Sequence, residues 1–97
     1  MSLKKPEWSI YMVRCRDGSL YTGIATDIER RFAEHQAGKG AKYLRGRAPL
    51  KLAFKKRIGS RSLALQIERM IKGLHKDKKE RIVKTIIDID QLRKRRK

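Results

Sequence analysis

The sequence contains no asparagine, only one cysteine and no long apolar run. Because Cys15 is alone, an internal disulfide is excluded, and no Cys or His lies near it at the spacing of zinc ligands. A reducing compartment is the economical interpretation. No segment approaches the roughly 18 apolar residues of a membrane span, and the N-terminal residues lack the apolar stretch of a signal peptide. We therefore expect a soluble, unexported, cytoplasmic protein.

Acidic residues are also few, because 10 Asp and Glu stand against 27 Lys and Arg, for a formal net charge of +17. Such an excess of one sign destabilises a compact chain by self-repulsion, so an anionic partner is expected. Nucleic acid fits better than a membrane surface, because the helices predicted below need their apolar residues for a core. With 39% hydrophobic residues among 97, we expect a single domain over 1–97 with its core at about 8–84.

The first half of the sequence predicts a β-hairpin followed by a helix. Residues 8–15 and 20–24 are rich in aromatic and β-branched side chains, and an Asp-Gly turn separates them. A Thr-x-x-Glu pattern at Thr26 and Glu29 predicts a capping box at the start of the helix, and Gly38 predicts its end.

The second half predicts one more strand and two helices. Residues 50–58 alternate apolar with charged side chains, which indicates a strand with one solvent-exposed face. Between 60 and 75 apolar residues recur at helical spacing, namely Leu63, Ile67, Met70, Ile71 and Leu74. Asp77 and Glu80 predict the start of a short third helix, and a basic tail follows at about 91–97. The expected fold is α/β (α+β), a small three-stranded antiparallel sheet flanked by helices in the order β-β-α-β-α-α.

Five side chains with chemical potential are spread over this predicted fold. Tyr11 ends the tripeptide SIY in the first strand, and Tyr21 begins the tripeptide YTG in the second. Arg31 and His35 lie one turn apart beside the apolar stripe of the first helix. Glu68 is the single acid in a long basic stretch, at the margin of the second helix's apolar stripe.

Each of these residues also has a structural interpretation. The two tyrosines can pack as a cross-strand pair, and Arg31 can extend from the edge of the core while His35 packs inside it. Glu68 can pair with Lys72 one helical turn later, a contact that contributes only about 0.3 to 0.5 kcal/mol.

Together, however, the side chains suit hydrolysis of a phosphodiester. A single glutamate is sufficient for a hard divalent ion such as Mg²⁺ or Mn²⁺, which keeps most of its waters. A guanidinium matches the extra negative charge of the five-coordinate transition state. A tyrosine surrounded by cations and a metal ion can have its pKa lowered from about 10, and a neutral histidine can accept or relay the proton.

The joint spacing of Tyr11, Tyr21, Arg31, His35 and Glu68 resembles the GIY-YIG nuclease superfamily. That superfamily includes the nicking domain of bacterial nucleotide-excision repair and homing endonucleases. The resemblance covers nearly the whole chain and looks strongest to small stand-alone bacterial proteins related to the excinuclease nicking domain. It implies a metal-dependent endonuclease that hydrolyses DNA, a structure- or damage-related nickase of repair or recombination. One Mg or Mn ion would be the cofactor, DNA rather than RNA the substrate, and association with the nucleoid would be compatible.

The resemblance also implies a role for each residue. Tyr11 would bind or deprotonate the attacking water, and Tyr21 would position water or phosphate. Gly23 would let the backbone pass closely. The remaining roles are phosphate binding by Arg31, assistance in proton transfer by His35, and metal binding by Glu68.

The chain departs from the family pattern at three points. Ser9 replaces a glycine in the first tripeptide, Thr22 replaces an isoleucine in the second, and the late asparagine of many relatives has no counterpart. A catalytically weak or inactive nucleic-acid-binding module is therefore the alternative. A ribosome-associated structural protein would explain the charge but not the spacing of the five residues.

The basic stretch GKGAKYLRGR at 38–47 is a second candidate for contact with nucleic acid. One interpretation is a clamp in which cations bind phosphates and an aromatic ring stacks on a base, with Lys39, Lys42, Tyr43, Arg45 and Arg47 as its members. The alternative is an exposed loop whose tyrosine covers the edge of the core. Specificity would come from DNA shape, from this loop or from a targeting protein, and the oligomeric state is left open.

Overall fold

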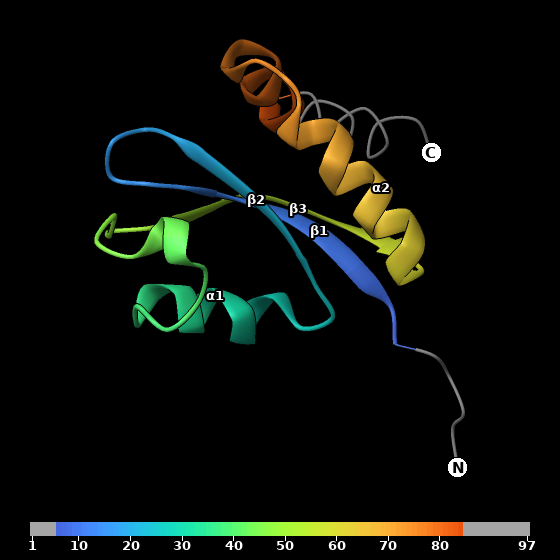
Figure 1. The fold of residues 1–97 in the computed structure, drawn as a ribbon, viewed down its shortest axis with the longest axis horizontal. Coiled ribbons are helices and arrows are strands. Elements are labelled where there is room, and N and C mark those ends of the chain that lie inside the picture. The colour runs from blue at the N-terminus through green and yellow to red at the C-terminus, as the bar shows by residue number, and fades with distance from the viewer. Residues whose placement is uncertain (1–5, 85–97) are drawn as a thin grey trace, which may run out of the picture.

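The computed structural model describes residues 6–84, which form a three-stranded antiparallel sheet between helices (Figure 1). The elements are β1 (Trp8–Arg14), β2 (Leu20–Ala25), α1 (Ile28–Gln36), the 3₁₀ helix η1 (Lys42–Leu44), β3 (Lys51–Gly59), α2 (Arg61–Lys72) and a last helix whose described part is 76–84. The strand order is β2-β1-β3. The predicted fold class and the order β-β-α-β-α-α are confirmed, and the predicted basic tail lies outside the described residues.

The hairpin between β1 and β2 turns at the predicted Asp-Gly pair. The carboxylate of Asp17 accepts hydrogen bonds from the backbone N–H and the hydroxyl of Ser19, at 3.0 and 2.7 Å. Gly18 has a φ of +88°, a conformation that favours glycine. This turn sets the register in which Tyr11 lies opposite Gly23.

Helix α1 begins one residue later than its capping box predicts. Its N-cap is Asp27, whose carboxylate accepts a hydrogen bond from the backbone N–H of Arg30 at 3.1 Å. The prediction that Thr26 and Glu29 form the cap is therefore wrong, because the neighbouring carboxylate satisfies the free amide instead. Gly38, at a φ of +77°, follows the helix end as predicted.

A β-bulge in β3 overturns the prediction of a strand with one solvent-exposed face. Met12 pairs with Phe54, whereas the next residue, Val13, pairs with Leu52, so Ala53 is an extra residue in the ladder. The extra residue reverses the pleat, and Leu52 and Phe54 consequently pack into different clusters. Strand β3 therefore contributes to both faces of the sheet.

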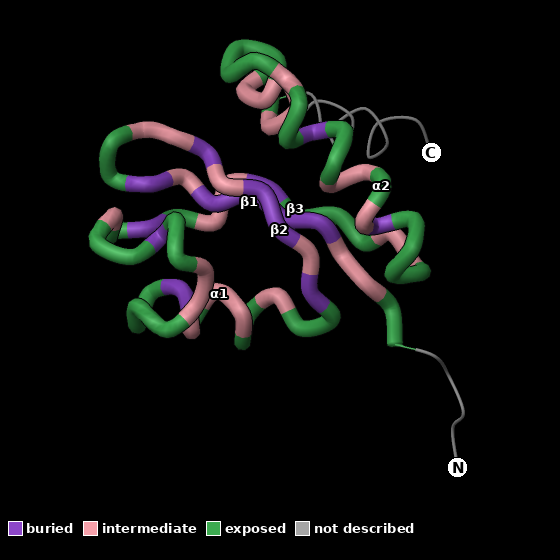
Figure 2. Tube along the Cα trace, in the orientation of Figure 1, coloured by how far each residue is buried: buried purple, intermediate pink, exposed green. Residues whose placement is uncertain are grey.

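Two hydrophobic clusters cover the two faces of the sheet. Because β1 is the central strand, alternate residues enter opposite clusters, Tyr11 and Val13 on the α1 side, Ile10 and Met12 on the α2 side. All four are at most 1% exposed. Figure 2 shows the buried segments concentrated on the strands, so the sheet is a rigid support for side chains that leave its edge.

Helix α2 buries a narrower stripe than its sequence predicts. Ala64 and Ile71 are buried and Ile67 packs against the same cluster, whereas Leu63 and Met70 are 45% and 70% exposed. The prediction that these last two belong to the core is wrong, because the small Ala64 lets the helix approach the sheet along another line. Within residues 6–84 no helix is long and apolar enough to cross a membrane.

Candidate active site at the edge of β2

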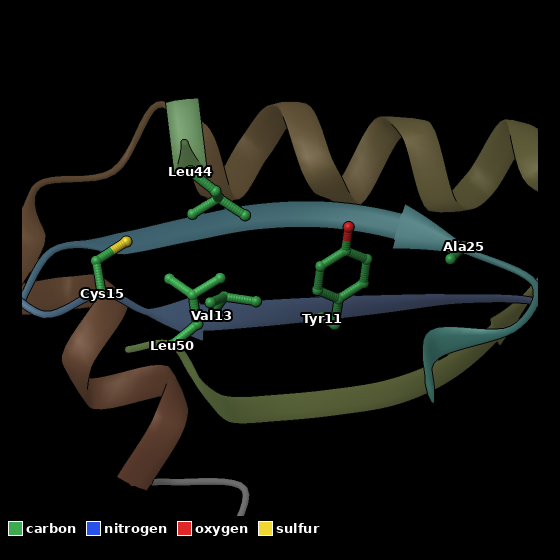
Figure 3. Packing of buried hydrophobic residues seen from close by; sticks show 6 residues of the cluster. All are labelled: Tyr11, Val13, Cys15, Ala25, Leu44 and Leu50. Carbon is green, nitrogen blue, oxygen red and sulfur yellow. The ribbon is translucent and has the colours of Figure 1, made fainter. Parts of the chain in front are cut away.

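The candidate site begins where the side chain of Tyr11 crosses β2 at Gly23. A Cβ at Gly23 would lie 2.6 Å from the Tyr11 hydroxyl oxygen, a distance that side chains do not tolerate. Figure 3 shows the phenol ring extending from β1 toward β2 with its oxygen pointing away from β1. Tyr11 itself is only 1% exposed. Glycine at this position therefore lets a buried phenol reach across the strand.

His35, on the last turn of α1, holds the hydroxyl of Tyr11. The Tyr11 oxygen and His35 Nε2 are 2.8 Å apart, and the ring is 2% exposed. On its other side, Nδ1 accepts a hydrogen bond from the backbone N–H of Ala41 at 3.2 Å. A backbone amide can only donate, so the neutral ring carries its hydrogen on Nε2 and donates it to Tyr11. Burial, followed by the charge of Arg31, lowers the pKa of His35 and keeps it neutral.

Glycine also permits the contact between the loop and His35. A Cβ on Gly40 would collide with His35 Nδ1, so the loop can approach the ring only where it has no side chain. Neither Gly40 nor Ala41 is among the site residues predicted from the sequence. Ala41 acts through its backbone N–H, and no sequence pattern predicts such a contact. The one indication in the sequence is Gly40, because a glycine permits the backbone to approach a ring closely.

Arg31 lies between a carboxylate and the phenol. Its guanidinium donates to Glu34 at 2.9 Å, and it is close enough to Tyr11 to lower the pKa of that phenol. Burial outweighs this effect and, with the charge of Tyr21, raises the pKa of Tyr11 to about 12. Arg31 thus lowers this pKa as expected, but the net shift in the protein without metal or substrate is upward because desolvation of the phenolate dominates.

Glu68 reaches the same place from α2, on the other face of the sheet. Its side chain is 17% exposed and pairs with Lys72 at 3.2 Å, and its charge raises the pKa of Tyr11. Lys72 in turn lies 5.7 Å from the centre of the Tyr21 ring. The predicted pair with Lys72 is therefore present, and it leaves Glu68 close enough to act on Tyr11.

Tyr21 is the centre of an aromatic cluster. Its ring lies 6.5 Å from Tyr11, 5.7 Å from His35 and 5.9 Å from Tyr43, on which it stacks. Tyr21 is half-buried, in contrast to the fully covered Tyr11. It is therefore the more accessible of the two phenols.

The basic loop divides into an anchoring part and an exposed part. Arg47 lies 4.2 Å over the ring of Tyr43 and binds the carboxylate of Asp17 at 2.8 Å, so these residues attach the loop to the hairpin turn. The other three predicted phosphate-binding cations are exposed, and none forms an ion pair with a residue in 6–84: Lys39, Lys42 and Arg45.

The carboxylate of Glu68 is a ligand that fits a hard divalent ion. Within residues 6–84 no group of three or more His, Cys, Asp or Glu side chains could enclose a metal. Glu68 is the carboxylate whose charge acts on Tyr11. Mg²⁺ or Mn²⁺ needs only one or two carboxylates, because water supplies its other ligands. The arrangement does not suit zinc, which takes three or four protein ligands.

A sequence model of the GIY-YIG catalytic domain matches residues 7–81. The chain belongs to the GIY-YIG family. The resemblance predicted from the five site residues is thereby confirmed. Nucleases of the GIY-YIG family generally use divalent metals, in agreement with the donor set around Glu68.

Relatives of this GIY-YIG protein are small chains of similar length. The UPF0213 protein Ent638_3592 of Enterobacter sp. (strain 638) is 59% identical over 76 residues, 78% of this chain and 74% of that protein. The UPF0213 protein YhbQ of Salmonella typhimurium is 57% identical over 78% of this chain and 76% of its own length.

Two solution NMR structures have the same GIY-YIG fold. The UPF0213 protein BH0048 from Bacillus halodurans is 42% identical with a TM-score of 0.55, covering 81% of this chain and 84% of that one. The protein EF2693 from E. faecalis is 39% identical with a TM-score of 0.60. The match covers 89% of this chain and 91% of that one. These names specify no reaction, and family membership supports endonuclease activity and a nucleic-acid substrate in general terms.

Proposed function

We propose that this GIY-YIG protein is a metal-dependent endonuclease that nicks DNA at branched or damaged structures, as in repair or recombination. The observation that carries the proposal is the convergence of side chains from β1, β2, α1 and α2 on one edge of the sheet. These are Tyr11, Tyr21, Arg31, His35 and Glu68. One such site cuts one strand at a time, and the reducing cytoplasm is the expected location.

Tyr11 and His35 would have different roles in proton transfer. Because His35 already donates from Nε2 to Tyr11, it does not take the phenol's proton. It stabilises the phenolate instead, as does Arg31, whose charge lowers the pKa of Tyr11. Tyr11 would first release its hydroxyl proton to solvent, and the phenolate stabilised by these donors would then orient the attacking water and accept its proton.

The remaining residues bind the phosphate. Arg31 keeps guanidinium donors beyond the one bound to Glu34, and it would contact the scissile phosphate. Tyr21, the accessible phenol, would position the phosphate or the water. A divalent cation held by Glu68, when bound, would polarise the phosphate and stabilise the leaving oxygen.

Cleavage assays with matched variants test the proposal. Branched, nicked, single-stranded and plain duplex DNA, with an RNA duplex for comparison, are incubated with Mg²⁺ or Mn²⁺. We expect the native chain to cut a DNA substrate, and Glu68→Gln and Arg31→Met to cut at least about 100-fold more slowly. Gln66→Ala, exposed on the same helix as Glu68, is the control and should cut normally. The proposal fails if the native chain cuts nothing, or if both site variants cut as fast as the control.

The second candidate is a nucleic-acid-binding module without the reaction. The 1% exposure of Tyr11 and its pKa of about 12 favour it, because such a phenol is a weak base in the free protein. Tight binding by the native chain without cleavage of any substrate would select this candidate.

A further inference from the structure

Trp8, the single tryptophan of the chain, lies at the start of β1 and outside both hydrophobic clusters. Among residues 6–84 neither cluster contains it, nor does it pack against either one. It is only half-buried. Since tryptophan buries more apolar surface than other side chains, a core would normally use it. Its position therefore needs another explanation than the packing of the sheet.

Trp8 lines two open hollows. The first, of about 340 Å³, is lined by two arginines and two carboxylates, Arg30, Arg31, Asp27 and Glu34. Arg31 is the arginine of the candidate active site. The second hollow, of about 790 Å³, is lined by Arg57 and Arg61. The guanidinium of Arg61 lies 5.4 Å from the centre of the Trp8 ring. Trp8 therefore shares one hollow with the active-site arginine and another with the guanidinium that lies near its ring.

Basic side chains gather around the hollow that Trp8 shares with Arg57 and Arg61. A third hollow, of about 500 Å³, shares Arg57 with the second and adds Lys55 and Lys56 from β3. Arg57 pairs with Glu7 at 3.2 Å, but both side chains are largely exposed, and such a pair contributes little against an incoming polyanion. A nucleic-acid strand in the hollow of Arg57 and Arg61 would therefore meet cations, whereas carboxylates also line the other two hollows.

We infer that Trp8 is a stacking platform for an unpaired base of the nucleic acid whose phosphate occupies the active site. Indole and guanidinium groups are the flat side chains on which bases stack, and here both line one hollow. A base inside a duplex cannot stack on a side chain, so the strand must be single-stranded or locally unpaired beside the cleaved bond. The inference rests on the proposed function and specifies its substrate class.

Tryptophan fluorescence tests the inference directly, because Trp8 is the only tryptophan. Glu68→Gln protein without metal is titrated with a single-stranded oligonucleotide and, separately, with a blunt duplex. We expect the single strand to quench the emission and the duplex to leave it nearly unchanged. In anisotropy titrations, Trp8→Leu should bind the single strand about tenfold more weakly and the duplex unchanged, whereas Trp8→Tyr should lose little.

The controls separate a stacking role from a loss of fold. Thermal unfolding monitored by circular dichroism establishes that Trp8→Leu is folded, and Arg61→Gln provides a second variant outside the sheet. Equal quenching of the Trp8 emission by the single strand and the duplex would overturn the inference. So would an unquenched Trp8 emission together with an unchanged affinity of Trp8→Leu for the single strand. Because these titrations measure binding without metal, they stay informative whether or not the native chain cleaves DNA.

Discussion

One hydrogen bond from the backbone determines which ring nitrogen of His35 carries the hydrogen, and the identities of the side chains do not reveal it. The amide of Ala41 fixes the proton on Nε2, so the ring acts as a donor toward Tyr11. The sequence identified the residue and left it either to accept the proton or to relay it, and this hydrogen bond favours a donor role. The direction depends on a backbone group six residues away, and residue identity does not encode it.

Glutamine at position 35 tests this assignment. Its carbonyl can accept from Ala41 while its amide donates to Tyr11, which reproduces the neutral tautomer without any titration. We expect His35→Gln to keep cleavage within about fivefold of the native rate, and His35→Leu to lose about 100-fold or more. The measurement is kcat/KM over a pH series, with His75→Gln, the other histidine and an exposed one, as control.

A proton acceptor at position 35 would give a different result. His35→Gln would then be as slow as His35→Leu while remaining folded by circular dichroism. The ¹⁵N shifts of the His35 ring report the tautomer independently of activity, and a hydrogen on Nδ1 would contradict the structure.

At the scale of elements, the sequence located the strands and α-helices of residues 6–84, but it missed η1 and misjudged several contacts. The bulge at Ala53 turned a pattern typical of one exposed face into a strand that packs on both sides. Glu80, expected to cap the last helix, instead binds Arg14 of β1 through two hydrogen bonds of 2.7 Å. Both differences arise from neighbours in space, which local patterns do not contain.

The Arg14 and Glu80 pair attaches the 76–84 helix to the hairpin. We expect Glu80→Gln to lower the free energy of unfolding by about 1 kcal/mol at pH 7, since each side chain is about one-third exposed and the pair is bidentate. Arg14 lowers the pKa of Glu80 below its usual 4.5. The stabilisation is therefore complete above about pH 4.5 and is lost as the pH falls further.

Urea unfolding at pH 7 and at lower pH checks both parts. The variant should show a smaller loss of stability on acidification than the native chain. Asp77→Asn, at an exposed position of the same segment, is the control and should behave like the native chain. An equal loss of stability in the two variants would show that the contact with Arg14 contributes nothing.

At the scale of the whole molecule, the basic loop at 38–47 contributes part of the formal charge of +17. The exposed loop cations Lys39, Lys42 and Arg45 stand near the tyrosine cluster, because Tyr43 of the same loop stacks on Tyr21. Arg47, although equally basic, serves to hold the loop in place.

Salt dependence of DNA binding distinguishes local interactions from total charge. Replacing Lys39, Lys42 and Arg45 by alanine should weaken binding and reduce the slope of log affinity against log salt by about 0.9 for each phosphate that the variant no longer neutralises. The control replaces Lys76, Lys78 and Arg81, exposed cations of the last helix, and has the same net charge. If the two variants show the same slope, the loop does not touch the DNA backbone.

The sequence by itself determined the fold class and the family and supplied the candidate residues of the site, because periodicity, turn chemistry and side-chain spacing are properties of the chain. Tertiary structure decided the rest: the tautomer of His35, the raised pKa of Tyr11, the anchoring role of Arg47 and the position of Trp8 beside Arg31. Each of these depends on burial or on a partner distant in the chain. Such effects arise only when the chain is folded, since water screens and satisfies the same groups in the unfolded state.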